Sequence, residues 1–251
     1  MFYPYPFSLQ FFFDGASRLP FFGFLPWGLR DDKPSAQDHF DLQEIVIDEL
    51  GRDQDVLHAR TVEDWAAILS EPEKSEVVSV RRDGVLIAQA VVLFPQTVQE
   101  ADMLDMELPD EPHRVATVCS VVTHPQYRCK DLMMELLHEA DIAAWKRGRQ
   151  HMLALINDTN FRSWTQFLKA GYYIVGCGFE PSDNINAYFA HRHLGQLSLT
   201  ESFQRAADRA IIIPPQPLDA MKIIFKDGYV GFESQRDDQG KHTGGLILAR
   251  A

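Results

Sequence analysis

The chain has 251 residues, 45% of them hydrophobic and 24% charged, which is typical of a globular protein whose core needs no structural metal or disulfide. Its formal net charge of −12 argues against a nucleic-acid partner, because such binding depends on lysine and arginine neutralising phosphates. Three cysteines without a C-x-x-C pair argue against a disulfide framework or a zinc site, and they favour a reducing, cytoplasmic setting.

Residues 1–40 form an arm rich in proline and aromatic residues. Prolines and charged residues such as Asp14 and Arg18 interrupt its apolar character, so we expect no signal peptide. No run of 18 apolar residues predicts a membrane span. Burying so many rings is favourable, and we therefore expect the arm to pack on its own domain or on a second copy of the chain. A wall of an apolar substrate pocket is the alternative interpretation.

The segment from residue 40 to residue 113 predicts a helix and several strands. Ile45 and Ile47 alternate with polar residues, a pattern typical of a strand. Thr61 is a suitable N-cap for a helix, and the Asp83-Gly84 pair predicts a hairpin. The expected elements are a strand at 44–50, a helix at 62–70, strands at 77–80 and 85–94, and an acidic loop or short irregular helix at 95–113.

Strands and helices then alternate, which predicts a mixed α/β fold with at least one right-handed parallel crossover. Leu132, Leu136 and Ala140 recur at helical spacing, and Gly148 ends that helix. The expected elements are strands at 115–122, 151–156, 172–175 and 187–191, and helices at 131–146 and 160–170.

The C-terminal part of the chain is predicted to contain a helix at 199–210 and a second hairpin. Its strands are expected at 221–225 and 229–233, around Lys226-Asp227-Gly228. The expected organisation is therefore an arm at 1–40, a core at 41–195 and an extension at 196–251.

The segment from Val121 to Met133 combines a buried strand, a short loop and the start of a helix. The first N–H groups of a helix have no intrahelical partners, and the helix dipole is positive at that end. Arg128 and Lys130 add positive charge. These features favour binding of a pyrophosphate.

This stretch resembles the acyl-CoA-binding loop of the GNAT superfamily, whose pattern is a strand, P-x-Y-R-G-x-G-x-G/A and a helix. The chain matches it with Pro125, Tyr127 and Arg128. A later family pattern, N-x-x-S/A-x-x-x-[YF]-x-x-x-G-[FY], is matched about 30 residues on by Asn160, Ser163, Phe167, Gly171 and Tyr172. The resemblance covers roughly residues 43–192. It implies a GNAT-like central mixed sheet flanked by helices.

Some residues of the chain differ from those usual in the family. Cys129 and Asp131 replace two glycines of the loop, and a carboxylate beside a pyrophosphate is repulsive. Asp131 is expected instead to cap the helix with its side-chain oxygen. Phe167 stands where family members often have a general-acid tyrosine, and it cannot donate a proton.

The resemblance implies an acyl-CoA-dependent N-acyltransferase, in which an amine of a small molecule or protein attacks the thioester of acetyl-CoA or a longer acyl-CoA. No metal is implied. The weak catalytic candidates are Cys119 and Tyr173, each of which also reads as a core residue. Asn160 is equally well explained as a plain N-cap. The implied cofactor-binding residues are Val121, Val122, Thr123, Arg128, Cys129, Lys130, Asp131, Leu132, Met133, Asn157, Asn160, Ser163 and Phe167.

Several charged residues near the ends of the central strand are further candidates. Glu107, Asp110 and Glu111 precede the strand, where an acceptor could approach, although a solvated acidic loop is the favoured interpretation. His113 and His124 lie near its two ends and are expected to be solvated.

Two other functions remain open at this stage. A non-catalytic GNAT-like binding or interaction module is favoured by Cys129, Asp131 and Phe167. A nucleotide-binding α/β protein is disfavoured, because the sequence has no G-x-G-x-x-G and no P-loop.

Overall fold

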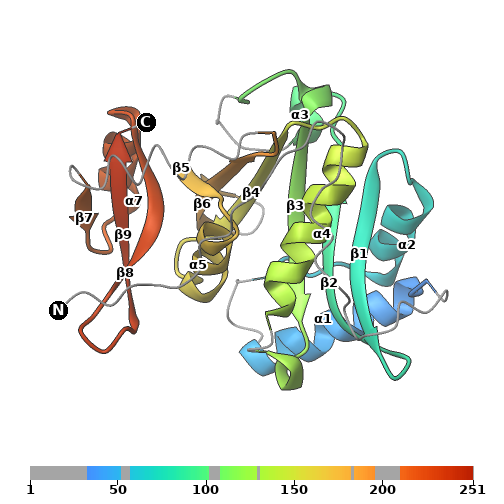
Figure 1. Cartoon of the computed structure of the whole chain (residues 1–251). Coiled ribbons are helices and arrows are strands. Elements are labelled where there is room, and N and C mark those ends of the chain that lie inside the picture. The colour runs from blue at the N-terminus through green and yellow to red at the C-terminus, as the bar shows by residue number, and fades with distance from the viewer. Residues whose placement is uncertain are drawn as a thin grey trace, which may run out of the picture.

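The computed structural model describes residues 33–51, 57–101, 108–128, 131–181, 184–195 and 210–250. These residues form a mixed α/β fold with one large mixed sheet flanked by helices (Figure 1). The strands follow one another in the order β1-β2-β3-β4-β6-β5-β8-β9-β7. Their bounds are β1 Ser75–Arg82, β2 Val85–Leu93, β3 Val115–Thr123, β4 His151–Asn157, β5 Tyr173–Glu180, β6 Ile185–His193, β7 Ile211–Ile213, β8 Tyr229–Arg236 and β9 His242–Arg250.

Helix α1 (Ala36–Leu50) covers the part of the chain where a strand was predicted at 44–50, and that prediction is wrong. The helix begins with a capping box between Ser35 and Asp38. Leu42 and Val46, one turn apart, are buried against the sheet, whereas Ile45 is 43% exposed. The four-residue spacing therefore outweighs the alternation of Ile45 with Ile47.

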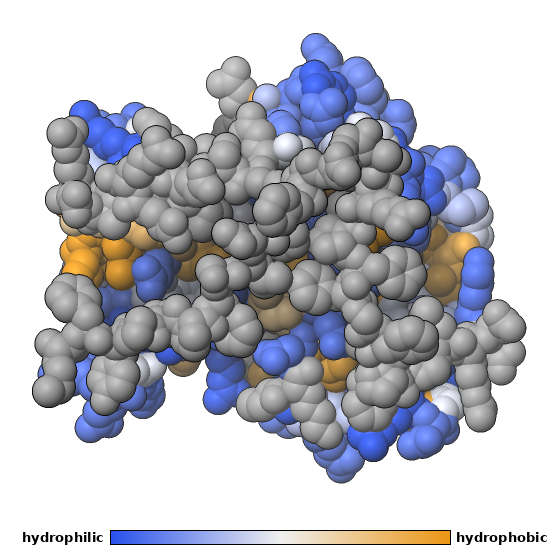
Figure 2. All heavy atoms as spheres, viewed as in Figure 1, coloured by the Kyte–Doolittle hydropathy of each residue, from blue (hydrophilic) through white to orange (hydrophobic). Residues whose placement is uncertain are grey.

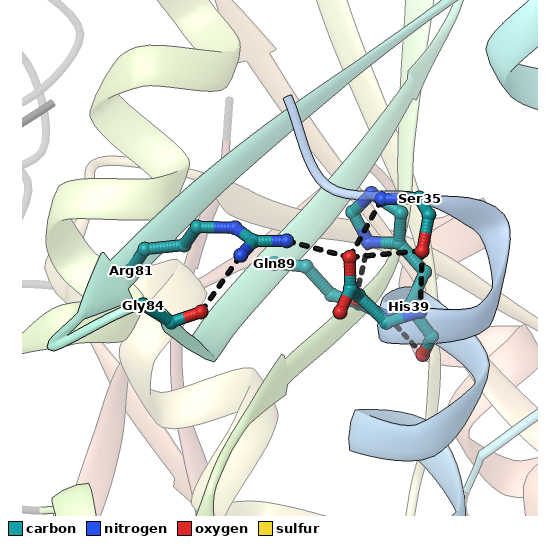
Figure 3. Close-up of polar contacts among 6 residues, drawn as sticks. Ser35, His39, Arg81, Gly84 and Gln89 are labelled. Atoms are coloured by element: carbon teal, nitrogen blue, oxygen red, sulfur yellow. Dashed lines mark hydrogen bonds and ion pairs between the residues drawn. The ribbon is translucent and has the colours of Figure 1, made fainter. Parts of the chain in front are cut away.

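Polar contacts fix the start of α1 on the β1–β2 hairpin (Figure 3). An Nη of Arg81 lies 2.6 Å from the Asp38 carboxylate, and its other Nη donates to the Gly84 carbonyl. Burial opposes ionisation of Asp38, yet the Ser35 hydrogen bonds and Arg81 lower the pKa of its carboxyl group. The buried His39 ring lies 2.6 Å from the Gln89 side-chain oxygen of β2. Helix α1 is thus anchored to the sheet by an ion pair and a buried hydrogen bond.

The predicted hairpin and the helix capped by Thr61 are both confirmed. Strands β1 and β2 pair in antiparallel register, and α2 (Val62–Ser70) begins with a capping box between Thr61 and Asp64. The region predicted as a loop or irregular helix at 95–113 contains two short helices, α3 (Val98–Ala101) and the 3-10 helix η1 (Pro112–Arg114).

Strands β3 and β4 run parallel and are joined by helix α4 (Leu132–Lys146), which confirms the parallel crossover. Helix α5 (Phe161–Lys169) connects β4 to β5, and β6 lies between them in the sheet. Trp164 and Leu136 bury the apolar faces of α5 and α4 in one core with Ala90 of β2. Gln89, which points to the opposite face of β2, meets α1. The sheet therefore separates α1 from α4 and α5.

The C-terminal hairpin lies further along the chain than expected. Helix α7 (Leu218–Lys226) occupies 221–225, so the predicted strand there is wrong, while the strand predicted at 229–233 is confirmed within β8. Met221 and Phe225 are buried one turn apart, and Ile223 between them is 64% exposed. The helix predicted at 199–210 lies almost wholly outside the described residues.

The C-terminal strands extend the same sheet through a narrow junction. Strand β8 pairs with β5 only through Ile174 and Gly231. Apolar atoms reach the surface at the β7 end of the sheet (Figure 2), where Ile212 of β7 is 56% exposed. None of the helices within the described ranges is long and apolar enough to cross a membrane.

Candidate acyl-CoA site

Strands β3 and β4 are paired only at their beginnings. Their parallel register joins Val115, Ala116 and Thr117 to residues 151–153 of β4. Strand β3 then continues to Thr123 and β4 to Asn157 without further pairing between them. The two strands diverge there, so no strand of the described residues pairs with the β4 side of residues 118–123, and backbone groups on that side can bind a ligand.

A β-bulge lies in this part of β3, on the side that pairs with β2. Cys119 is opposite Val91 of β2 and Val122 is opposite Gln89, so Ser120 and Val121 share one partner position. Ser120 has a φ of 49°, which is uncommon for a residue with a side chain. Bulges break the regular alternation of backbone groups and often occur beside active sites. The bulge therefore redirects N–H and C=O groups at the place where the strands diverge.

The chain passes from β3 through the 3-10 helix η2 (Pro125–Tyr127) to the N-terminus of α4. Asp131 occupies the N-cap position with φ 56° and ψ 13°, but its side chain makes no capping hydrogen bond. The prediction that its oxygen caps the helix is therefore wrong. Left-handed backbone favours glycine and is tolerated by aspartate, so Asp131 preserves a glycine-like loop shape. Cys129 and Lys130 lie outside the described residues.

The predicted pyrophosphate ligand Arg128 is already in contact with a carboxylate. Its Nη1 lies 2.7 Å from an oxygen of Glu49, near the end of α1, and the two side chains are 29% and 43% exposed. In the first turn of α4, burial and then the Asp131 and Glu139 carboxylates raise the pKa of Glu135. The loop thus combines an uncapped helix N-terminus and an arginine with nearby negative charge.

The other predicted residues of the loop are partly buried. Val121 and Met133 pack against the main core and Leu132 is part of it. Val122 is buried against α1, and Thr123 is half-buried. Met133 occupies the position of the last glycine or alanine in the GNAT loop pattern. Like Cys129 and Asp131, it is larger than the residue usual there.

The polar residues that follow β4 form the turn into α5. The Asn157 side-chain oxygen accepts from the backbone N–H and hydroxyl of Thr159. Asn160 is the N-cap of α5, with its side-chain oxygen 3.1 Å from the Ser163 N. Phe167 is 3% exposed and packs edge-on against Tyr172 in the core. Asn160 therefore caps helix α5, and Phe167 is part of the hydrophobic core.

Cys119 lies directly before the bulge, beside an arginine that sequence reasoning missed. The Arg60 Nε donates to the Ser120 hydroxyl at 2.9 Å, and its Nη2 lies 3.5 Å from the Cys119 sulfur. Burial raises the pKa of the Cys119 thiol, although Arg60 opposes that effect. Cys119 is therefore a protonated thiol at neutral pH. No sequence signal indicated Arg60, because it lies 60 residues before Ser120.

The structure does not bring Tyr173 to the diverging strands. Tyr173 lies in β5, and β6 and β4 separate that strand from β3. It is 9% exposed and packs with Ala249 of β9. The two catalytic candidates therefore stand on different parts of the sheet.

A histidine cluster occupies the beginning of β4 and the end of β6. His151 Nδ1 lies 3.0 Å from His191 Nε2, and the His193 ring packs edge-on against His151. Asp110 lies 3.4 Å from His151 Nε2 and 2.8 Å from an Nη of Arg114. Burial, followed by the charges of His151 and His193, lowers the pKa of His191 to about 4. His191 is therefore neutral at pH 7.

The remaining charged candidates lie at the ends of β3. Asp110 is paired as described, Glu111 and His113 are exposed, and Glu107 lies outside the described residues. The His124 Nδ1 accepts from the backbone N–H of Gln126, and its ring packs edge-on against Tyr127. Within the described part of the chain, no group of three His, Cys, Asp or Glu side chains is arranged to hold a metal ion.

These features fit an acyl-CoA in two respects and oppose it in one. The bulged, unpaired edge of β3 can bond an extended amide chain, and the uncapped start of α4 beside Arg128 can take a phosphate. The Asp131 carboxylate weakens that second interaction without blocking the helix N–H groups. The residues therefore fit the cofactor.

Comparison with known proteins finds similarity in solved structures only; no family model and no curated protein matches this sequence. An N-acetyltransferase from Staphylococcus aureus Mu50 is 15% identical, with a TM-score of 0.49 over 64% of this chain and 95% of that one. A GNAT-family acetyltransferase from Streptococcus pneumoniae is 15% identical, with a TM-score of 0.48 over 65% and 98%. A ribosomal-protein-alanine N-acetyltransferase from Brucella melitensis is 17% identical, with a TM-score of 0.47 over 64% and 96%. Acetyltransferases thus recur among the similar structures.

Proposed function

We propose that this chain is a divergent GNAT acyltransferase that moves an acyl group from acyl-CoA to an amine. The observation that carries the proposal is the combination of a bulged β3, which is unpaired on its β4 side, with the N-terminus of α4, where Asp131 makes no capping hydrogen bond. An extended donor with a diphosphate at one end needs both features in that order. In this proposal residues 41–195 form the catalytic core and residues 196–251 an extension of its sheet.

In this proposal the donor is held by backbone groups and by charge. The pantetheine amides bond the backbone of β3 near Val121, Val122 and Thr123. The pyrophosphate is held by the first N–H groups of α4 and by Arg128. Glu49 contacts only Nη1 of Arg128, so other N–H donors of the guanidinium are left for the phosphate while the Glu49 carboxylate opposes it by charge.

The acceptor amine attacks the thioester carbonyl directly. A C–N bond forms, the C–S bond breaks, and the amine gives up one proton while the departing CoA thiolate takes up one. A backbone N–H of the bulged stretch is suited to stabilising the oxyanion, because its direction is fixed before the substrate binds. Cys119, whose thiol keeps its proton at neutral pH, is unsuited to acting as a nucleophile.

Calorimetric titration with acetyl-CoA tests this proposal. Arg128→Ala should weaken binding, while Arg147→Ala should not. Arg147 is a matched control because its ion pair with Glu76 has similar exposure, 33% and 43%, and it lies at the other end of α4. Equal affinities of the two variants would remove Arg128 from the site.

The loop also supports a second candidate, a GNAT-like module that binds a partner without acyl transfer. The Glu49–Arg128 pair and the Asp131 carboxylate both oppose the pyrophosphate. The two candidates differ in one result. A chain that binds no acyl-CoA of any length at millimolar concentration would exclude the transferase, and a chain that binds one and acylates an amine would exclude the module.

A further inference from the structure

Arg60 is a cation placed beside the proposed reaction centre, and among the described residues Asp64 interacts with it through longer-range charge alone. Its side chain spans from the segment before α2 to the bulge of β3, where it contacts Ser120 and Cys119. Both contacts are with neutral groups, and a thiol is a weak acceptor. Among the residues that the structure describes, no carboxylate lies within ion-pairing distance of its guanidinium. Most of its five N–H donors are therefore available to a ligand.

The backbone of Arg60 is held firmly. The buried Gln43 side chain of α1 donates to the Arg60 carbonyl at 2.8 Å and accepts from the Arg60 N–H at 3.0 Å. Helix α1 is itself anchored to the sheet through Asp38 and His39 (Figure 3). This places the guanidinium at a fixed position, which lowers the entropy lost when it binds a ligand.

Arg60 is half-buried beside the bulge, where a bound carboxylate would offset the partial desolvation of its charge. A planar guanidinium binds a carboxylate through two parallel hydrogen bonds. The same charge repels a polycationic amine. The net charge of −12 would disfavour an anionic acceptor unless a local cation offset it.

We propose that Arg60 selects the acceptor, and that the acceptor is an amine carrying a carboxylate, such as an amino acid or the terminus of a short peptide. This inference rests on the proposed acyl transfer. The acceptor carboxylate pairs with Arg60 while its amine, once deprotonated, reaches the thioester beside the bulge. Arg60 thus determines specificity and takes no part in proton transfer.

The test compares the twenty amino acids with their amides as acceptors of acetyl-CoA. We expect the wild type to prefer at least one acid over its amide by about 10- to 100-fold in kcat/KM, which is the range for a charge-assisted hydrogen bond. Arg60→Ala should abolish that preference and Arg60→Lys should keep part of it. Ser120→Ala removes one contact but leaves the cation, so it should keep the preference.

Two readouts separate this inference from the proposed function. Acetyl-CoA affinity, measured by calorimetry, should be the same in wild type and Arg60→Ala, which also shows that the variant is folded. Binding of the preferred amino acid should be lost in Arg60→Ala even without acetyl-CoA. Amides that react as well as acids, or a preference that survives Arg60→Ala, would overturn the inference. If the wild type binds no acyl-CoA, the proposed function is overturned, and this inference, which rests on it, is overturned with it.

Discussion

Replacing Asp131 with asparagine should make CoA bind more tightly. Asparagine also tolerates the left-handed backbone found at this position, where φ is 56°, and the Asp131 side chain makes no capping hydrogen bond that the change would break. The substitution therefore removes a charge and leaves the loop shape unchanged. Two unit charges about 4–6 Å apart in water repel by about 0.7–1 kcal/mol. With two negative charges on the pyrophosphate, the gain is about 1.5–2 kcal/mol, or roughly 10- to 30-fold in Kd.

Calorimetric titration with CoA at low and high salt measures this gain, which should shrink as salt screens the charges. Pantetheine, which lacks the pyrophosphate, should bind wild type and Asp131→Asn equally. Asp83 provides a matched control, because it also has a positive φ, 54°, but lies in the β1–β2 turn. An unchanged CoA affinity in Asp131→Asn, or an equal gain in Asp83→Asn, would refute the electrostatic reasoning.

Three further predictions concern the ion pair, the histidines and the thiol. Glu49→Gln should free Arg128 and tighten CoA binding by about 1.5- to 5-fold, as expected for a surface ion pair, whereas Glu76→Gln should have no effect on the same titration. His191→Gln should remove roughly 3 kcal/mol of pH-dependent stability between pH 7 and pH 4, measured as the difference from wild type in chemical unfolding. Cys119→Ala should retain acyl transfer within about tenfold, and mass spectrometry should detect no acetylated Cys119 in the wild type, because the thiol keeps its proton.

The sign of the histidine prediction follows from where the proton binds. Burial lowers the pKa of His191 to about 4, so the unfolded chain takes up a proton at higher pH than the folded one. The stabilisation is complete above pH 6.5 and is lost as the pH falls toward 4. Asp141 has the opposite effect on stability. Burial raises the pKa of its carboxyl group to about 6, so its contribution to the free energy of unfolding falls as the pH rises to that value. Subtracting the variant from the wild type isolates His191.

The sequence predicted elements well where apolar spacing and end signals agreed. The helix at 62–70 had Thr61 at its start, and the hairpin had Asp83-Gly84 at its turn. The strand predicted at 44–50 is wrong because the alternation of apolar residues there is local. The helix is set by the capping box at Ser35, which lies eleven residues before Val46. The strand predicted at 221–225 is wrong for a related reason. Asp227-Gly228 is a pair typical of hairpin turns, but here it ends helix α7, and Gly228 has φ 82°.

The candidate site was predictable only where its parts are close in the chain. The loop from β3 to α4 was visible in 121–133, and so was the N-cap role of Asn160. The neighbours that alter the chemistry of the loop come from distant segments. Glu49 reaches Arg128 from 79 residues away, and Arg60 reaches Ser120 from 60 residues away. Neither contact leaves a periodic signal, because both depend on how α1 is docked on the sheet.

Hydrogen exchange with and without acetyl-CoA tests the central claim most directly, since it shows which backbone amides the ligand protects. We expect slower exchange in peptides covering 118–128 and 131–137, which contain the bulge of β3 and the start of α4, and no change in the C-terminal hairpin at 229–250. Arg128→Ala should reduce the protection at 131–137 more than that at 118–123. Protection confined to the hairpin, or absent from both predicted segments at saturating acetyl-CoA, would contradict the acyl-CoA site.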